Sequence, residues 1–192
     1  MILEINKFVL LLILLLSVKS DITYRKIPNK LTFPVMLWGI GSAGLFSGFN
    51  GILFSIGGFL VGLAVFFVPF SMGGMGAGDV KLMAAIGSVM GWKLTVYSAL
   101  LTAITGGIIV IGYTIYKGYF IKMLKNIGTA LFKKIFYFAY LVTHNEKIMM
   151  RFTTLSEEKS NFEKTYIPYG VAIAIGTLIV LIGNHFGYSP FI

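Results

Sequence analysis

Long apolar runs are the feature that most constrains what this chain folds into. Of its 192 residues, 57% are hydrophobic and 12% are charged, whereas roughly a quarter of an ordinary soluble domain is charged. A helix that crosses a bilayer needs about 20 mostly apolar residues, and several stretches of the chain approach or reach that length. The sequence therefore predicts an all-α integral membrane protein, with no length left for a separate soluble domain of ordinary size.

Charged and glycine-rich segments divide the apolar sequence into six predicted transmembrane helices. Their approximate ranges are 5–18, 31–47, 52–70, 80–92, 94–116 and 167–183. The first range follows Glu4, contains Lys7 and lacks a small-x-small cleavage site, so we interpret it as a retained helix and not as a cleaved signal. Residues 1–192 form one predicted polytopic domain, with a long loop at 117–165.

The basic residues predict the orientation of these helices. With the N-terminus outside, all but two of the 16 Lys and Arg residues fall on the inner side, the exceptions being Lys7 and Lys93. Such an asymmetry follows the positive-inside rule. It also favours a crossing helix at 80–92, which is short for a hydrocarbon core of about 30 Å. A re-entrant loop there would place the nine later basic residues outside. The net charge of +9 is accounted for in this way, without nucleic acid.

Residues 119–142 show a different pattern. Polar residues recur there on one face at helical spacing, and apolar residues occupy the other face. The polar set is Lys122, Lys125, Asn126, Thr129 and Lys133, and the apolar set is Phe120, Met123, Leu124, Ile127, Leu131 and Ile135. This pattern predicts a basic amphipathic helix lying on the inner leaflet, with docking of a partner as the alternative.

The chain has only two aspartates, and both fall at predicted inner ends of helices. Asp21 is expected just past the first helix and Asp79 just before the fourth. An ionisable residue near a membrane helix is costly, which makes it a functional hypothesis. The alternative is an interfacial charge balanced by neighbouring cations, such as Arg25 near Asp21 or Lys81 near Asp79.

Glycines surround the second aspartate, in the order Gly73-Gly74-Met75-Gly76-Ala77-Gly78-Asp79. Glycine permits the close approach of another backbone, which a protease needs because its substrate lies extended against the catalytic group. No GK[ST] follows, which excludes a Walker loop. The segment does not join a strand to a helix, which excludes a dinucleotide fingerprint.

Three motifs together resemble one enzyme family. Gly76-Ala77-Gly78-Asp79 matches the GxGD signature of membrane aspartyl proteases, and Asp79-Val80-Lys81-Leu82 extends it as in bacterial prepilin peptidases. Asp21-Ile22-Thr23-Tyr24-Arg25-Lys26-Ile27-Pro28-Asn29 is similar to the family's first aspartate motif. Ile167-Pro168-Tyr169-Gly170 resembles its proline–glycine motif at the start of the last span.

The chain differs from the long prepilin peptidases, which carry an N-terminal cytoplasmic region with paired CxxC motifs and a methyltransferase activity. Here the first predicted helix begins within the first few residues, and cysteine is absent. The chain thus resembles the short, peptidase-only branch that serves tight-adherence (Flp) pili, and methyltransferase activity is not expected.

The resemblance implies a catalytic pair, Asp21 and Asp79, with Gly76 and Gly78 in the active-site loop and no metal or organic cofactor. Two close carboxylates would share a proton and activate water. The implied substrates are prepilin or pseudopilin precursors with a short basic leader, cut at the cytoplasmic side of the inner membrane. Pro168, Tyr169 and Gly170 are possible substrate contacts, although packing is the favoured role of Tyr169.

Three other functions stay open on the sequence alone. Two aspartates also suit an ion-coupled carrier or channel, although their place at helix ends and the absence of a repeat count against it. A non-catalytic component of a pilus or secretion machine would use them as interfacial charges. A presenilin-like GxGD protease would cut helices inside the bilayer. His144 and His185 lie on opposite sides in the predicted topology and form no common metal site.

Overall fold

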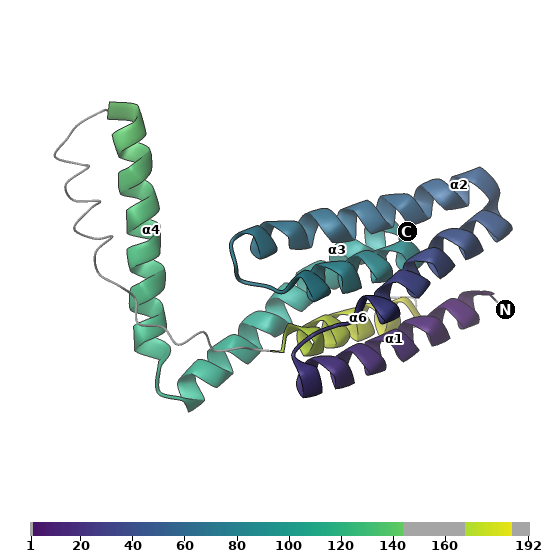
Figure 1. Cartoon of the computed structure of the whole chain (residues 1–192), viewed down its shortest axis with the longest axis horizontal. Coiled ribbons are helices and arrows are strands. Elements are labelled where there is room, and N and C mark those ends of the chain that lie inside the picture. Colours follow the sequence, from purple (N-terminus) through teal and green to yellow (C-terminus); the bar gives the residue numbers. More distant parts are fainter. Residues whose placement is uncertain (1, 144–167, 186–192) are drawn as a thin grey trace. The chain divides into compact units, whose positions relative to one another are not determined.

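The computed structural model describes residues 2–143 and 168–185, and in these residues all regular structure is helical (Figure 1). The all-α prediction is confirmed for this part of the chain. The helices are α1 (Ile2–Tyr24), α2 (Asn29–Ser71), α3 (Ala77–Tyr116), α4 (Phe120–Thr143) and α6 (Tyr169–His185). The chain divides into two compact units, one made of Met1–Ile109 with Tyr166–Ile192 and the other of Val110–Thr165.

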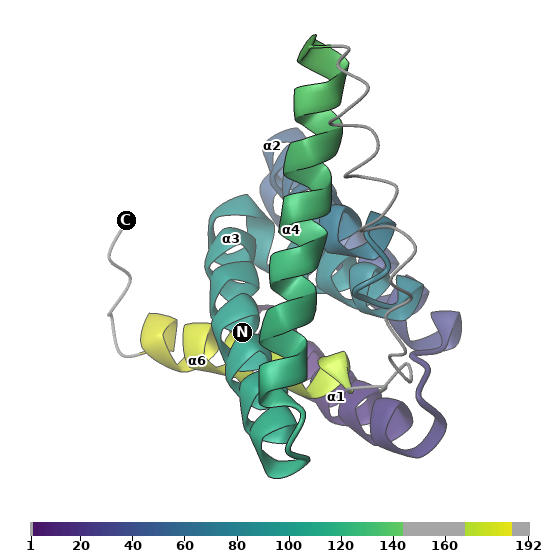
Figure 2. The same ribbon diagram turned by 90° about the vertical axis from the view of Figure 1, so that its left-hand side faces the viewer.

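In the first unit, α1 packs against both α2 and α6. Figure 2 shows α6 beside α1, as Figure 1 does from the other direction. This arrangement brings a helix from the C-terminal part of the chain against the first helix, and it positions the site described below.

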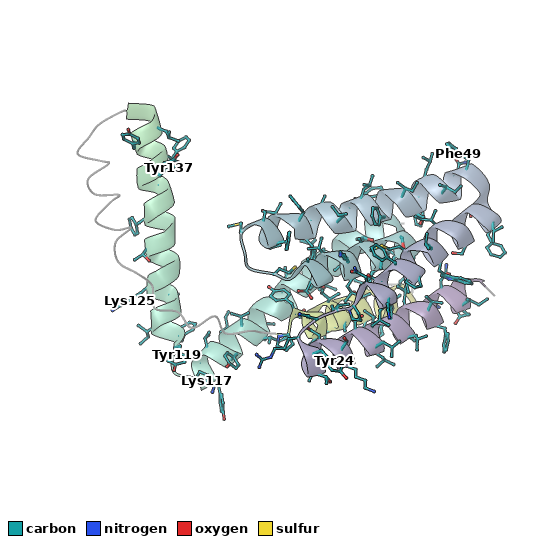
Figure 3. The ribbon with its side chains drawn as sticks, in the orientation of Figure 1. Tyr24, Phe49, Lys117, Tyr119, Lys125 and Tyr137 are labelled. Atoms are coloured by element: carbon teal, nitrogen blue, oxygen red, sulfur yellow. The ribbon has the colours of Figure 1, made fainter. Side chains whose placement is uncertain are left out.

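Two glycines break the long helices. Gly48 has φ 60° and ψ −145° inside α2, and Gly91 has φ 75° and ψ 172° inside α3. Both values of φ lie in the left-handed region that only glycine adopts without strain. The breaks fall where the sequence predicted boundaries between spans. The exposed side chain of Phe49, beside the first break, points away from the helices (Figure 3).

The second half of α2 packs closely on the first half of α3. A Cβ on Gly58 would overlap the carbonyl of Gly87, and one on Gly62 would lie 2.5 Å from the carbonyl oxygen of Met83. Gly58 and Gly62 are four residues apart and thus lie on one face of α2, which faces α3. Small residues of this kind let helix backbones approach within a membrane.

Polar and apolar side chains are distributed as expected for a lipid environment. Leu15, Leu37 and Leu45 are largely exposed, whereas Ser55 and Thr102 are buried. The buried hydroxyls donate to backbone carbonyls, such as Ser55 Oγ to the oxygen of Ser88 at 2.6 Å. Many large apolar side chains are exposed in this way, which is consistent with a surface that faces lipid.

By length and composition, α2 and α3 are apolar enough to cross a membrane, and α6 is a shorter apolar helix. These features are consistent with a membrane protein. The count of six spans and the inside–outside orientation stay predictions.

The second unit contains the predicted amphipathic helix, observed as α4 over Phe120–Thr143, with Lys125 and Tyr137 both exposed on it (Figure 3). Its placement on the inner leaflet stays a prediction. The rest of the predicted loop, from residue 144, lies outside the described residues up to residue 165, as does His144.

Two expected boundaries are wrong. Helix α1 continues to Tyr24, so Asp21 lies inside it and not past it. The polar residues that follow Val18 do not end the helix, because its turn-to-turn hydrogen bonds continue to Arg25 N–H, which donates to the Asp21 carbonyl oxygen at 2.9 Å. Helix α3 begins at Ala77, within the glycine-rich segment, so Asp79 lies in its first turn and not before it.

Candidate active site

Asp21 is held by the start of a distant helix. Its side chain is 1% exposed, and its Oδ2 accepts a hydrogen bond of 2.8 Å from the backbone N–H of Gly170. Gly170 lies in the first turn of α6, where backbone N–H groups have no acceptor within their own helix. The carboxylate satisfies one of these donors, and its negative charge lies at the positive end of the helix dipole.

This contact depends on the absence of a side chain at Gly170. A Cβ there would lie 2.8 Å from Asp21 Oδ2 and 3.1 Å from Asp21 Cβ. Of the three residues predicted as substrate contacts, Gly170 therefore touches Asp21. Tyr169 instead packs its ring on Gly106 of α3, where an added Cβ would lie 3.1 Å from the ring. The carbonyl of Pro168 accepts a hydrogen bond of 3.3 Å from the N–H of Val171, at the start of α6.

The Asp79 side chain caps the N-terminus of α3. Its Oδ2 accepts a hydrogen bond of 3.1 Å from the N–H of Gly76, while its own N–H donates to the Gly76 carbonyl oxygen at 3.1 Å. Gly76 precedes the first helical residue, so Asp79 occupies the third helical position and reaches back as in a capping box. The side chain is 5% exposed. The local sequence thus explains why an aspartate is stable in this buried position.

The two aspartate motifs contact each other. The backbone and Cβ of Ile27 lie against Gly78, where an added Cβ would be 3.1 Å from Ile27 Cβ and 3.2 Å from its nitrogen. Lys81 Nζ donates to Asn29 Oδ1 at 2.9 Å, across a separation of 52 residues. Ile27, Asn29 and Lys81 belong to the quoted motifs, but sequence reasoning gave a role only to Lys81, as a cation that would balance Asp79. A pattern of residue types carries no signal for such a pairing.

The turn between α1 and α2 is fixed by local bonds. Arg25 has φ 54°, and the hydroxyl of Ser20 donates to the carbonyl oxygen of Lys26 at 2.7 Å. These contacts fix the backbone of the short turn that joins Asp21 to Ile27. Because Ile27 packs on Gly78, the end of α1 that contains Asp21 lies near the start of α3.

All the residues predicted for the catalytic pair and its loop therefore lie together. Asp21 and Asp79 are both buried and lie within range of each other's charge. Gly76 and Gly170 each donate a backbone N–H to one of the carboxylates. In residues 2–143 and 168–185, no group of three His, Cys, Asp or Glu side chains gathers that would hold a metal ion.

Comparison with known proteins identifies the family. The model of the type IV leader peptidase family matches residues 8–111, which is more than half of the chain and includes both aspartates. The chain belongs to the type IV leader peptidase family. The resemblance inferred from the three motifs is confirmed at this level.

Curated relatives agree with this assignment. Proteins named prepilin leader peptidase/N-methyltransferase from Aeromonas hydrophila and from Aeromonas salmonicida (strain A449) are each 29% identical to this chain over 106 residues. The matched segment covers 52% of this chain and 36% of each relative, so the match spans about a third of the relatives' length. No solved structure matches the chain.

Proposed function

We propose that this type IV leader peptidase family member is a membrane aspartyl endopeptidase in which Asp21 and Asp79 are the catalytic residues. The observation that carries the proposal is that the two aspartates of the chain are both buried and lie close enough for the charge of Asp21 to act on Asp79, although 58 residues separate them in the sequence. Each has one carboxyl oxygen held by a backbone N–H, which limits its rotation.

This arrangement suits general acid–base catalysis. Two carboxyl groups in one buried site do not both ionise readily, so the pair holds one proton between them. The ionised carboxylate removes a proton from water as the water oxygen adds to the scissile carbonyl carbon. The protonated carboxyl gives its proton to the carbonyl oxygen, which completes a tetrahedral intermediate. Collapse of this intermediate breaks the C–N bond, and the leaving nitrogen takes a proton from the pair.

The proposed substrates are prepilin or pseudopilin precursors with a short basic leader. The proposed location is the inner membrane, with six spans, the N-terminus outside and the active site at the cytoplasmic side. The distribution of Lys and Arg supports this orientation. A precursor inserted in the same membrane would present its basic leader on that side.

Asp79 also has a competing structural role, because it caps α3. The substitution Asp79→Asn separates the two roles, since an asparagine keeps the side-chain oxygen that accepts the Gly76 N–H but does not ionise. Asp21→Asn likewise keeps an acceptor for Gly170. We expect both variants to accumulate normally in membranes and to lose cleavage by about a thousandfold, the order of magnitude of general acid–base catalysis.

The measurement is co-expression with a panel of leader-bearing precursors, with cleavage followed as a size shift on immunoblots and the cut site read by mass spectrometry. Glu4→Gln is the matched control, because it removes an exposed carboxylate from the other end of α1. Cleavage by wild type and Glu4→Gln, lost in both Asp→Asn variants, supports the pair. Cleavage that survives either Asp→Asn substitution contradicts it.

A further inference from the structure

The C-terminal end of α3 is expected at the boundary between hydrocarbon and water. No charged residue lies between Lys93 and Lys117, and the segment 94–116 is about 35 Å long at 1.5 Å per residue. This length suits a hydrocarbon core of about 30 Å. Helix α3, which is apolar enough to cross a membrane, ends at Tyr116. The chain therefore leaves the predicted membrane core where α3 ends.

A tight turn keeps the start of α4 beside that boundary. The N–H of Tyr119 donates to the Thr114 carbonyl oxygen at 2.9 Å, and the N–H of Gly118 donates to that of Ile115 at 3.0 Å. These two bonds, with Gly118 at φ 70°, form a Schellman motif that stops α3. Only residues 117–119 separate the two helices, so the first residue of α4 lies within about 15 Å of the last residue of α3.

Exposed tyrosines mark the same boundary. Tyr116 ends α3 and is largely exposed, and Tyr119 in the turn is about half exposed. Lys117 lies exposed between them in the chain, and Figure 3 labels it together with Tyr119 at this turn. A tyrosine ring is apolar and carries a polar hydroxyl, so tyrosines are enriched where hydrocarbon meets water. This composition places the turn and the start of α4 at an interface.

Helix α4 has an apolar face that the described part of the chain leaves uncovered. Leu124, Ile135 and Phe138 are each more than half exposed. At about 100° per residue they fall within about 60° of one another around the helix axis. A continuous apolar face of this kind is unfavourable in water, and covering it with hydrocarbon is favourable.

The charge of α4 has one sign. The helix contains four lysines and neither aspartate nor glutamate. Lys122, Lys125 and Lys133 belong to the polar face, and Lys125 is exposed (Figure 3). Lysines on an amphipathic helix that lies at a membrane boundary favour negatively charged headgroups, and each one strengthens binding to such a surface about fivefold.

We propose that α4 binds the surface of an anionic bilayer, with its apolar face among the upper acyl chains and its lysines beside the lipid phosphates. Two other occupants of this face are opposed by charge. A basic leader, such as that of the proposed substrates, would be repelled by the lysines of α4. A second copy of α4 would bring like charges together. The bilayer surface instead supplies hydrocarbon and negative charge at the place where α3 ends.

The test is spin labelling of the full chain reconstituted into vesicles, which is simple because the chain contains no cysteine. Phe138→Cys carries a nitroxide on the apolar face, and Thr129→Cys carries one about 180° away. Collisions are measured with oxygen, which concentrates in hydrocarbon, and with a nickel chelate, which stays in water. In vesicles of phosphatidylcholine with phosphatidylglycerol, we expect oxygen to dominate at position 138 and the nickel chelate to dominate at position 129.

The same labels decide what covers the apolar face. In vesicles of phosphatidylcholine alone, access of the nickel chelate to position 138 should rise several-fold. Unchanged access would overturn the preference for anionic lipid. Equal access of the nickel chelate to both positions in the anionic vesicles would overturn the membrane contact. Protection of position 138 from both reagents would show that protein covers this face, and would overturn the proposal in favour of a partner.

Charge variants test the lysines directly. Combining Lys122→Gln, Lys125→Gln and Lys133→Gln should lower the ratio of bound to unbound α4 on anionic vesicles by about a hundredfold, since each lysine contributes about fivefold. The matched triple Lys→Arg variant keeps the charge and should keep the wild-type collision pattern. Equal patterns in the two triple variants would overturn the role of charge. No precursor is cleaved in these measurements, so this inference and the proposed peptidase activity succeed or fail separately.

Discussion

The two ends of the first unit differ sharply in packing, although the same helices build both. At the aspartate end, backbone meets side chain without a gap, at Gly170 against Asp21 and at Gly78 against Ile27. At the other end, near the start of α1, the helices leave a cavity of about 540 Å³. Its lining includes Asn50 and Asn184, whose amides have no partner among the described residues.

The difference follows from the cost of burying each kind of group. A buried carboxylate must be satisfied by hydrogen bonds, so its surroundings are fixed in detail. A neutral amide near a helix end can form hydrogen bonds with different small molecules, including water. Apolar contacts with the cavity wall do not depend on direction. One end is therefore suited to fixed geometry, and the other does not require it.

Among variants that change the packing and leave both aspartates in place, the largest effect is expected from Gly170→Ala. Its methyl group would lie 2.8 Å from Asp21 Oδ2, so the carboxylate or the start of α6 must shift. A shift of about 1 Å in a catalytic group reduces the rate by about a hundredfold, and precursor cleavage should fall by this factor.

Gly107→Ala is the control for that variant, because nothing lies within 4 Å of its added Cβ on α3. Cleavage should stay at the wild-type rate in the control. Equal rates in the two variants would show that close packing around Asp21 does not matter for cleavage.

A second substitution, Gly58→Ala, tests the packing shared by both ends. Its Cβ would overlap the Gly87 carbonyl, and overpacking of this kind costs about 1–3 kcal/mol of stability. We expect a lower thermal unfolding temperature in detergent, with cleavage reduced as well. Gly57→Ala, whose Cβ meets nothing within 4 Å, should unfold at or above the wild-type temperature.

A smaller effect is expected from Lys81→Met, which removes the 2.9 Å hydrogen bond to Asn29 but keeps much of the side-chain volume. A hydrogen bond to a charged group contributes about 1.5–3 kcal/mol, less when partly exposed, so cleavage should fall roughly tenfold. Lys81→Arg keeps a donor and should restore most of the rate. The contact of α4 with anionic vesicles should not change, and a parallel loss there would indicate general unfolding instead.

The smallest effect is expected from Lys7→Met. The Glu4 side chain of the Lys7–Glu4 pair is 71% exposed, and ion pairs that reach solvent in this way contribute at most about 1 kcal/mol. Cleavage and thermal stability should both stay close to wild type. A strong loss of cleavage would show that the two ends are coupled.

The helices were predictable because their signals are local. Apolar runs, glycines and charged segments indicated helices near 5–18, 31–47, 52–70 and 94–116, with breaks close to Gly48 and Gly91. The boundaries around the aspartates were wrong, since α1 continues past Asp21 and α3 begins before Asp79. The segments around both aspartates have the polar or glycine-rich composition of a loop, but their backbone groups form helical hydrogen bonds.

The candidate site was predictable only as a set of residues. The motifs selected Asp21, Asp79, Gly76, Gly78 and Gly170, and the family match agrees with that selection at the level of the family. The sequence predicted that Asp21 and Asp79 lie at a similar depth in the membrane. Two residues at the same depth can still lie on opposite sides of a helix bundle, so depth alone does not predict that they are close.

By itself, the sequence determined the helical class, the membrane character and the family, because hydropathy, residue type and motif spacing depend on near neighbours in the chain. Only the tertiary structure decided that Gly170 donates to Asp21 across 149 residues, that Asn29 binds Lys81 across 52, and that a cavity remains at the other end. Such contacts depend on how whole helices pack against each other. A small change in the crossing angle of two helices, or in the position of a helix break, would break some of these contacts and form others.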